Sequence, residues 1–265
     1  FQSVTGRNAY ADVDLWAAQA HVLHVVLAKE ADVLVIAPAT ANVLAKLAHG
    51  LADDLLGLTA LSATCPILVA PAMDGGMWVN PATQENVKLL KKRGILFIGP
   101  ETGHLASGLD YMGRMTEPQE ILGHIRYLLS RNGPLKGKKI VVTASGTQES
   151  IDPVRFIGNR SSGKQGFALA QAALDIGADV RLIAGPATLP TPSGARRQNV
   201  TTAQEMSKAV LASCREADVL IMAAAVADFR PTRQHPQKLK KAKGTPLLTL
   251  EPTPDTTPNS PPVSP

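Results

Sequence analysis

The sequence predicts an α/β protein with two parallel-sheet domains joined by a short linker. Short apolar runs of strand length alternate with amphipathic stretches of helix length along most of the chain. A polar segment rich in glycine, proline and basic residues interrupts this alternation, which then starts again. Strands separated by helices form βαβ units, in which the strands lie side by side and parallel.

The first half of the pattern predicts a domain at residues 1–130. Its strands are expected at residues 33–37, 66–70 and 95–98, and its helices at residues 42–50, 81–93 and 117–129. Because the sequence opens in the middle of this pattern, the amino-terminal part of the domain is expected to lie before Phe1.

The second half predicts a similar domain at residues 139–250, after a linker at residues 131–138. Its strands are expected at residues 139–143, 179–184 and 218–224, and its helices at residues 162–176 and 203–216. Residues 251–265 are rich in Pro, Thr and Ser and are predicted to be disordered. The predicted fold is therefore two Rossmann-like (flavodoxin-like) parallel-sheet domains, the second incomplete.

Composition excludes several classes of protein. The chain has 265 residues, of which 45% are hydrophobic, and no apolar run approaches the roughly 18–20 residues of a membrane helix. No signal peptide is visible, so we predict a cytoplasmic protein without a membrane partner. The net charge is +5, and the lysine clusters have few aromatic residues among them, which favours anionic small molecules over nucleic acid. The histidines show no ligand spacing, so metal ligands stay unassigned.

Two loops that begin with proline are the first candidates for a binding site. Residues 38–43 (PATANV) and residues 71–78 (PAMDGGMW) each follow a predicted strand. In open parallel sheets, ligands bind at the carboxyl ends of the strands. An ordinary connecting loop is the alternative for either segment taken alone.

Together with residues 105–115 (LASGLDYMGRM), these loops resemble motifs of the flavin-dependent cysteine decarboxylase family. The closest resemblance is to the decarboxylase half of the bifunctional phosphopantothenoylcysteine decarboxylase/phosphopantothenate–cysteine ligases of coenzyme A synthesis. It implies FMN as cofactor, held by Pro38, Ala39 and Thr40, and a flap at residues 105–115 that covers the substrate. The family's glycine-rich loop for the flavin phosphate is expected before Phe1.

The same resemblance implies roles for individual residues. His24 would be the catalytic histidine, since an imidazole can remove a proton near neutral pH; a histidine on a helix surface is the alternative. Asn42 would bind the substrate carboxylate or carbonyl through its amide, although Asn42 can also cap the following helix. The other implied substrate contacts are Met73, Asp74, Ala106 and Arg114.

Two residues depart from the family pattern. Asp74 stands where the family has Asn, and an ionised Asp would repel a substrate carboxylate. We expect Asp74 to be protonated, to pair with a cation, or to make a different contact. Ser107 stands at the catalytic position of the usual proton-donor Cys. A hydroxyl is a far weaker acid than a thiol of pKa about 8.5, so the proton would come from another group or from water, or the reaction would stop at the enethiol.

Residues 143–147 (TASGT) and 152–164 (DPVRFIGNRSSGK) predict an anion site in the second domain. Small residues before a helix expose backbone N–H groups, and the helix dipole favours an anion there; a plain helix cap is the alternative. The phosphate candidates are Gly146, Thr147, Ser161, Ser162 and Gly163. These segments resemble the signature of the CTP-dependent ligase half of the same bifunctional family.

That resemblance implies that CTP activates the phosphopantothenate carboxylate as an acyl-cytidylate, which cysteine then attacks. Asn159 and Lys238 would be catalytic, with Arg155 binding substrate nearby, and Mg²⁺ or a similar cation would accompany the nucleotide. The segment 238–241 (KLKK) has a solvated basic loop as its alternative interpretation. The implied CTP contacts are Met222, Ala223, Ala224, Asp228, Lys238, Pro254 and Asp255.

The predicted function is therefore a two-step part of coenzyme A synthesis. Phosphopantothenate, cysteine and CTP would give phosphopantothenoylcysteine, and FMN-dependent decarboxylation would then give 4'-phosphopantetheine. The resemblance implies a homo-oligomer, with trimeric decarboxylase domains and dimeric ligase domains. A regulatory relative with impaired catalysis is one alternative, and a peptidyl-cysteine decarboxylase of the same fold is another.

Overall fold

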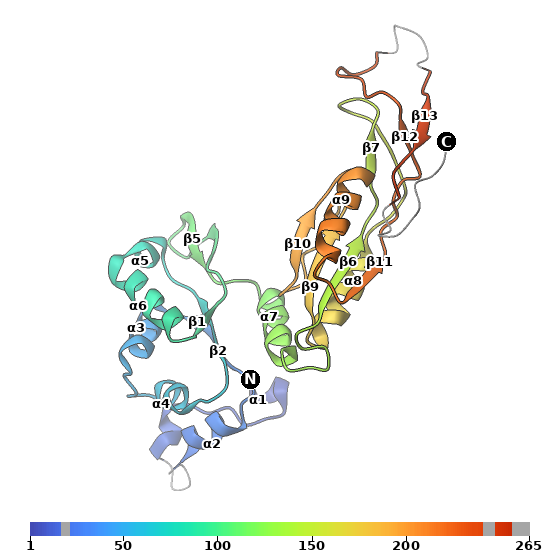
Figure 1. Cartoon of the computed structure of the whole chain (residues 1–265). Helices are drawn as coiled ribbons and strands as arrows, with labels where there is room; N and C mark the ends of the chain where they lie inside the picture. Colours follow the sequence, from blue (N-terminus) through green and yellow to red (C-terminus); the bar gives the residue numbers. More distant parts are fainter. Residues whose placement is uncertain (17–21, 241–246, 256–265) are drawn as a thin grey trace. The chain divides into compact units, whose positions relative to one another are not determined.

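The computed structural model of the chain describes residues 1–16, 22–240 and 247–255. It divides into two compact units, Phe1–Leu129 and Ser130–Pro265, each described here by itself (Figure 1). Residues 131–138, the predicted linker, fall in the second unit. The backbone N–H of Leu135 donates to the Ile176 carbonyl at 2.8 Å, which ties this segment to the second unit.

The first unit contains a parallel sheet with helices on both faces. Its helical elements are α1 (Gln2–Thr5), η1 (Asp12–Trp16), α2 (Leu23–Glu30), α3 (Ala41–His49), α4 (Leu55–Ser62), α5 (Gly75–Val79), α6 (Pro81–Lys92) and α7 (Pro118–Ser130). Its strands are β1 (Leu34–Ala39), β2 (Ile67–Pro71), β3 (Leu96–Phe97), β4 (Glu101–His104) and β5 (Asp110–Arg114). The sheet has the order β1-β2-β3, and β4 and β5 form a separate antiparallel hairpin.

Two apolar clusters hold helices on the two faces of this sheet. Leu44 of α3 and Leu90 of α6 pack on Val69. Ile121 of α7 packs on Leu68, the neighbour of Val69 in β2. Successive residues of a strand point to opposite faces, so α7 lies across the sheet from α3 and α6.

The predicted strands and helices of the first unit are present with ends shifted by a few residues, but several elements were not predicted. Helix α4 has apolar residues on all sides and therefore no amphipathic period; Asp54 caps it by accepting the Gly57 N–H at 2.6 Å. Residues 71–78 were interpreted as a loop without helix, and this was wrong because α5 begins inside the segment at Gly75. The Asp74 side chain caps that helix.

The second unit also contains a parallel sheet. Its helices are α8 (Lys164–Asp175) and α9 (Ala203–Cys214). Its strands are β6 (Lys139–Ala144), β7 (Gln148–Ser150), β8 (Phe156–Gly158), β9 (Asp179–Ala184), β10 (Arg196–Asn199), β11 (Val219–Met222), β12 (Phe229–Pro231) and β13 (Leu250–Pro252). Pairs β7–β8 and β12–β13 are antiparallel.

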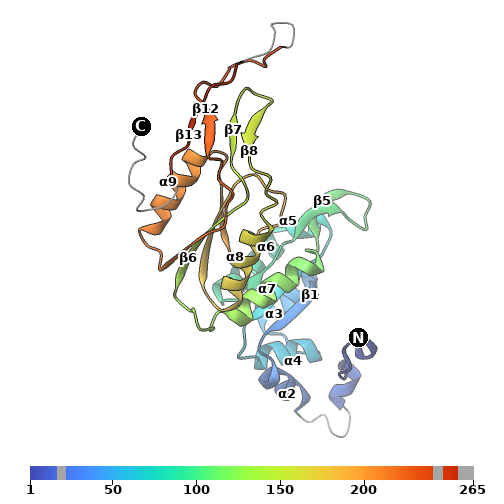
Figure 2. The ribbon, with the colours of Figure 1, turned by 90° about the vertical axis from the view of Figure 1, so that its right-hand side faces the viewer.

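The parallel sheet of the second unit has the strand order β10-β9-β6-β11. The chain moves outward from β6 through β9 to β10, and then returns to the other side of β6 as β11. Helices α8 and α9 lie on opposite sides of the sheet (Figure 2). Met206 and Val210 of α9 pack on Val141, while Gly166 of α8 lies against Ala144.

The predicted disordered tail is not disordered at its start. Leu250, Glu251 and Pro252 form β13, which pairs with β12, and Glu251 forms an ion pair with Arg230 at 2.8 Å. Backbone pairing and this ion pair therefore give a regular structure to the start of a segment that has almost no apolar residues. Residues 256–265, which carry the rest of that prediction, lie outside the described residues.

Candidate functional site

The two proline-led loops of the first unit meet at the carboxyl edge of its sheet. Ala39 and Pro71 are partners in the β1–β2 register, and the Ala72 N–H donates to the Ala39 carbonyl at 3.0 Å. The predicted FMN contacts Pro38, Ala39 and Thr40 therefore lie beside the loop that carries Met73 and Asp74.

Thr40 starts helix α3 at this edge. Its hydroxyl accepts the Val43 N–H at 3.3 Å and caps the helix. The cap interpretation of Asn42 is thus wrong, because Asn42 is already inside the helix. The Asn42 side chain is exposed and can donate and accept hydrogen bonds at the helix N-terminus.

The half-buried carboxylate of Asp74 is bound by the flap and by its own helix. The Ser107 hydroxyl donates to it, and the Gly76 N–H donates to its Oδ1 at 2.9 Å. These two hydrogen bonds, the one from Ser107 first, lower the pKa of Asp74 below its usual range. We expected Asp74 to be protonated, to pair with a cation, or to make a different contact. The structure agrees with the third expectation, because the ionised carboxylate binds the flap and its own helix. The two departures from the family pattern are in contact with each other.

The flap hairpin packs directly on the loop. The Met73 N–H donates to the Gly113 carbonyl of β5 at 3.0 Å. A Cβ on Gly75 would overlap the ring of Tyr111, so glycine allows β5 to pack closely on the start of α5. Ser107 and the exposed Ala106 lie between β4 and β5, at the tip of the hairpin.

Arg114, a predicted substrate contact, is already paired with two carboxylates. Its guanidinium lies 3.3 Å from Glu101 Oε2 and 2.9 Å from Glu117 Oε1. Its Nε is buried and has no hydrogen-bond partner among the described residues. A role in substrate binding stays a prediction.

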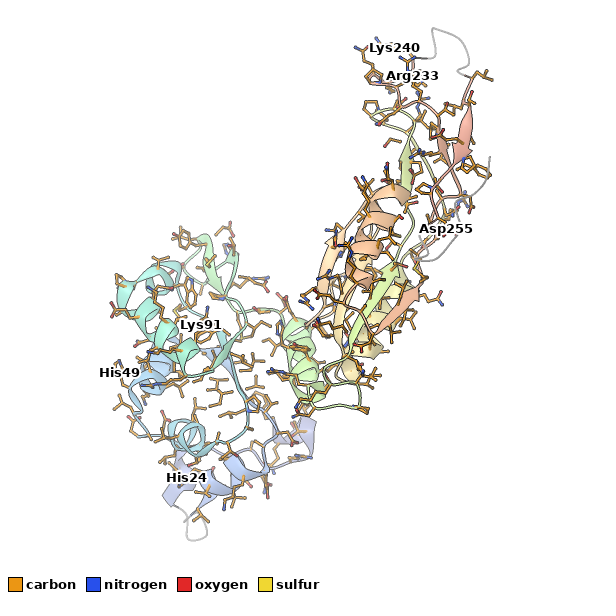
Figure 3. The ribbon with its side chains drawn as sticks, in the orientation of Figure 1. His24, His49, Lys91, Arg233, Lys240 and Asp255 are labelled. Atoms are coloured by element: carbon orange, nitrogen blue, oxygen red, sulfur yellow. The ribbon has the colours of Figure 1, made fainter. Side chains whose placement is uncertain are left out.

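The structure does not bring His24 to this loop and flap. His24 lies in α2, which packs on α4 at one end of the unit, whereas α5 and β5 lie at the other end (Figures 1–3). Within the described part of a single chain, the fold thus brings together residues 38–42, Met73, Asp74 and Ser107. His24 lies apart from them.

In the second unit, the predicted nucleotide residues meet where the strand order reverses. Residues 145–147 follow β6 and residues 223–228 follow the neighbouring β11. The Ala225 N–H donates to the Ser145 carbonyl at 2.8 Å, and Gly146 pairs with Ala225 as an isolated bridge. In open parallel sheets such a reversal is where ligands bind.

Ser145 has an unusual conformation and an unpartnered hydroxyl at this point. Its φ is +69°, in the left-handed region that non-glycine residues seldom adopt. Its Oγ is buried without a hydrogen-bond partner among the described residues. A Cβ on Gly163 would overlap this oxygen, so the hydroxyl faces the start of α8. Ser145 was not among the predicted site residues, although its place between β6 and Gly146 was a usable signal.

The remaining phosphate candidates surround the same helix start. The Ser161 and Ser162 hydroxyls lie 3.4 Å from the backbone nitrogens of Gly163 and Lys164, respectively. Thr147 is buried, and its hydroxyl accepts the Ala227 N–H at 2.9 Å. Asn159 donates to the Val226 carbonyl at 2.9 Å, which brings it to the strand-end segment 223–228.

Asp152, which the sequence analysis did not assign, organises the loop that carries Lys238. Its buried carboxylate accepts from Arg155, Nε at 3.0 Å, and from the Leu239 N–H at 3.1 Å. The Arg155 guanidinium first, and then the backbone N–H groups of Val154, Leu239 and Arg155, hold the pKa of Asp152 well below its usual range. Arg155 also donates to the Leu239 carbonyl at 2.9 Å, so its guanidinium ties two loops together. Lys238 is exposed, and Lys241 lies outside the described residues.

The other predicted CTP contacts lie at the end of β11 and beside β13. The hydroxyl of Thr143 in β6 accepts the Ala223 and Ala224 N–H groups at 3.1 Å each. The Thr253 N–H donates to the Asp228 carbonyl at 2.9 Å, which places Pro254 and Asp255 near Asp228 in the chain's path. Met222, Asp228, Pro254 and Asp255 are exposed.

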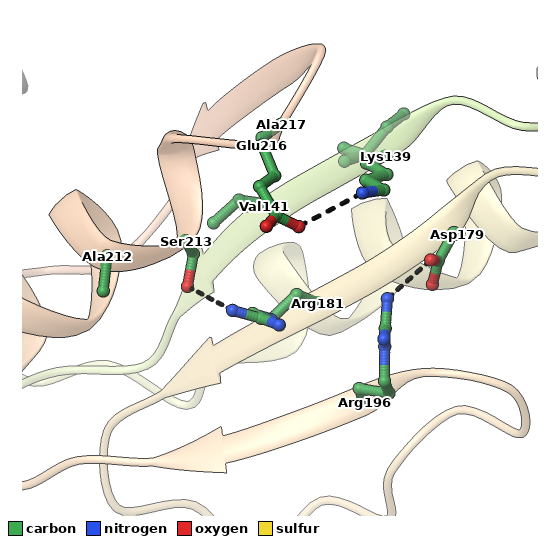
Figure 4. A pocket seen from close by; sticks show the side chains of 10 residues that line it. Lys139, Val141, Asp179, Arg181, Arg196, Ala212, Ser213, Glu216 and Ala217 are labelled. Carbon is green, nitrogen blue, oxygen red and sulfur yellow. Dashed lines mark hydrogen bonds and ion pairs between the residues drawn. The ribbon is translucent and has the colours of Figure 1, made fainter.

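A pocket of the second unit lies away from these residues, at the amino-terminal ends of the strands. Lys139, Arg181 and Glu216 are among its lining residues (Figure 4). Lys139 pairs with Glu216 at 3.2 Å, and Arg181 donates to Ser213 at 3.1 Å. Because its charged side chains already have partners within the pocket, this pocket does not replace the strand-end site as the candidate.

The described residues contain no group of three or more His, Cys, Asp or Glu side chains that could hold a metal ion. Within those residues, no helix is both long and apolar enough to cross a membrane.

Comparisons with known proteins match both units. A family model described as "Flavoprotein" matches residues 1–130, and one described as "DNA/pantothenate metabolism flavoprotein C-terminal domain" matches residues 135–259. The chain is 48% identical over 256 residues to the coenzyme A biosynthesis bifunctional protein CoaBC of Mycobacterium bovis, covering 94% of this chain and 61% of that relative. It therefore spans about 61% of the length of this relative.

Two further matches describe decarboxylases. A cysteine/cysteine sulfinic acid decarboxylase of an unknown prokaryotic organism is 46% identical over 261 residues, covering 96% of this chain and 69% of that protein. A solved PPC decarboxylase mutant complexed with pantothenoylaminoethenethiol is 43% identical, with a TM-score of 0.42, covering 44% of this chain and 68% of that chain. The decarboxylase relative at 46% identity, of which this chain covers 69%, and the two models that match the two units show that the chain belongs to this flavoprotein family, and it is similar to the coenzyme A biosynthesis bifunctional protein CoaBC.

Proposed function

We propose that the intact protein acts in coenzyme A synthesis, ligating cysteine to 4'-phosphopantothenate with CTP and decarboxylating phosphopantothenoylcysteine with FMN. The observation that carries the decarboxylase part is the junction of residues 38–42, Asp74 and the flap tip at one sheet edge, inside the region that the flavoprotein model matches. The ligase part rests on the second unit and on the bifunctional relative.

The residues at the first sheet edge fit a flavin. Pro38 and Thr40 are exposed at this edge, with the buried Ala39 between them, so a planar ring would contact the first two residues. The α3 N-terminus adds the exposed Asn42 amide and a partial positive charge. Bound FMN would supply the redox chemistry that allows CO2 to leave the cysteinyl group.

The chain's own groups would bind and orient the substrate and move protons. Asn42 would hold the substrate carboxylate or carbonyl, and the flap with Ser107 would close over it. Because α2 lies at the other end of the unit from β5, we propose that His24 completes the site of another copy in a trimer. The proton that returns to the substrate would then come from His24 or from water.

In the second unit, the residues at the strand ends fit a nucleoside triphosphate. The buried and unpartnered Ser145 hydroxyl and the start of α8 offer donors to an anion. Residues 223–228 and Asp255 would contact the cytidine, and Asn159 and Lys238 would stabilise the developing charge of the acyl-cytidylate. Since no acidic cluster is present among the described residues, a Mg²⁺ ion would be held mainly by the phosphates. The ligase domains would form dimers.

The test is CO2 release from phosphopantothenoylcysteine by the flavin-loaded intact protein. We expect His24→Ala to abolish the release and Ser107→Ala to leave at least part of it. Mixing inactive His24→Ala chains with inactive Asn42→Ala chains should restore some activity if the two residues act across copies. A flavin-loaded parent that releases no CO2 would contradict the decarboxylase function.

A regulatory relative with impaired catalysis is the second candidate, because both departures, Asp74 and Ser107, lie in the decarboxylase site and bind each other. Such a protein would bind flavin and release no CO2 from any cysteinyl compound. The same assay therefore separates the two functions.

A further inference from the structure

The loop and flap of the first unit carry an excess of negative charge. Residues 71–78 and 101–117 contain four carboxylates, on Asp74, Glu101, Asp110 and Glu117, and one guanidinium, on Arg114. Arg114 is paired with Glu101 and Glu117, and Asp110 lies 3.6 Å from the exposed His104. Among the described residues, no cationic side chain forms an ion pair with Asp74.

Asp74 is held in a position from which it can bind a ligand's cation. Its backbone begins α5, Tyr111 covers the neighbouring Gly75, and the Ser107 hydroxyl donates to the carboxylate. A carboxylate has about four lone-pair sites, so the bonds from Ser107 and the Gly76 N–H leave capacity for further donors. Such a donor gains most when it carries a positive charge.

We infer that the decarboxylase site takes cysteine with a free, protonated α-amino group, and that Asp74 binds this ammonium group. Free cysteine offers an ammonium, whereas the nitrogen of an acylated cysteine is a neutral amide. Both compounds carry the thiol and the carboxylate, so the groups that react are the same. Asp74 would thus be a specificity residue that favours the free amino acid.

The reaction balances without a further co-reactant. The bond between Cα and the carboxyl carbon breaks, CO2 leaves, its bonding electron pair stays on the remaining fragment, and Cα gains a proton. Cysteine plus one proton gives cysteamine and CO2. The oxidation and the later reduction of the sulfur-bearing carbon cancel, with FMN as oxidant and then reductant. This inference rests on the proposed function, since the flavin-dependent decarboxylation proposed above supplies the loss of CO2.

The test compares two substrates in the flavin-loaded intact protein and in Asp74→Asn. Asn is also a good helix cap, so the variant removes the charge while keeping the start of α5. We expect CO2 and cysteamine from L-cysteine, and about a tenfold loss of kcat/KM for L-cysteine in Asp74→Asn, the size of one charge-assisted hydrogen bond. The kcat/KM for phosphopantothenoylcysteine should fall by less, because its amide nitrogen carries no positive charge for Asp74 to bind.

Asp54→Asn is the matched control, since Asp54 caps α4 in the same way, away from the flap. It should leave the ratio of the two kcat/KM values unchanged. Equal losses for both substrates in Asp74→Asn, or release of CO2 from phosphopantothenoylcysteine alone in the parent, would overturn the inference while leaving the proposed function intact.

A binding measurement keeps the inference testable if neither substrate reacts, an outcome that would refute the proposed function. L-Serine and N-acetyl-L-serine lack the oxidisable thiol, and their affinities for the flavin-loaded protein can be measured by calorimetry. A preference for L-serine that falls about tenfold in Asp74→Asn supports the ammonium site. No preference, or one that Asp74→Asn leaves unchanged, overturns it.

Discussion

Replacing Gly75 with alanine should destabilise the first unit only while Tyr111 is present. The added Cβ would overlap the Tyr111 ring, and overpacking of this kind costs about 1–3 kcal/mol. Alanine is better than glycine in a helix by up to about 1 kcal/mol, which offsets part of that cost. In a Tyr111→Ala background the overlap is gone, so Gly75→Ala should be neutral or slightly stabilising. The two substitutions should therefore couple by about 1–3 kcal/mol.

Urea titration followed by tryptophan fluorescence measures this coupling in the intact protein. The two tryptophans, Trp16 and Trp78, both belong to the first unit, so the signal reports the unfolding of that unit. Tyr111 is 49% exposed and can escape the added methyl group by lifting the flap. Cleavage of the flap by a protease should therefore accelerate in Gly75→Ala. Additive effects within about 0.5 kcal/mol would refute the packing of β5 on α5.

Three further predictions concern local contacts. Thr202 and Glu205 form a capping box at the start of α9, so Thr202→Ala should destabilise the second unit by about 1 kcal/mol in thermal unfolding, and Thr202→Ser should not. Ser145→Ala should leave thermal stability nearly unchanged, because it removes an unpartnered hydroxyl, yet weaken CTP binding in calorimetry; unchanged CTP affinity would contradict the phosphate assignment. Lys46 is the main cause of the lowered pKa of Asp54, so their pairing stabilises the fold above the unfolded pKa of about 4 and is lost as the pH falls below it. Lys46→Met should therefore make the acid-induced loss of first-unit stability less steep, and an unaltered pH profile would argue against the pairing.

The sequence was sufficient for the elements whose burial has a simple pattern. β2 is a short, continuous apolar run because helices cover both faces of its sheet. β10, in contrast, has the sequence RRQN and was not predicted. It is an edge strand with mostly exposed side chains, so its order comes from pairing with β9 rather than from apolar residues.

The candidate site was only partly predictable for a related reason. Strand ends can be located from the sequence, and this led to residues 38–43 and 71–78. The contact between Ser107 and Asp74 joins residues more than thirty positions apart, and it depends on how the β4–β5 hairpin folds back on the loop. The hydrogen bond that the Leu239 N–H donates to Asp152 is likewise set by tertiary structure, which no local pattern encodes.

We propose that the first unit decarboxylates cysteinyl thiols through a flavin bound at residues 38–42. The most direct measurement is to mix the flavin-loaded intact protein with phosphopantothenoylcysteine or L-cysteine without oxygen, and to follow flavin absorbance and CO2 together. We expect a transient bleaching of the flavin that accompanies CO2 release and is lost in Asn42→Ala with flavin still bound. Bound flavin that keeps its full absorbance, with no CO2 from either compound, would contradict it.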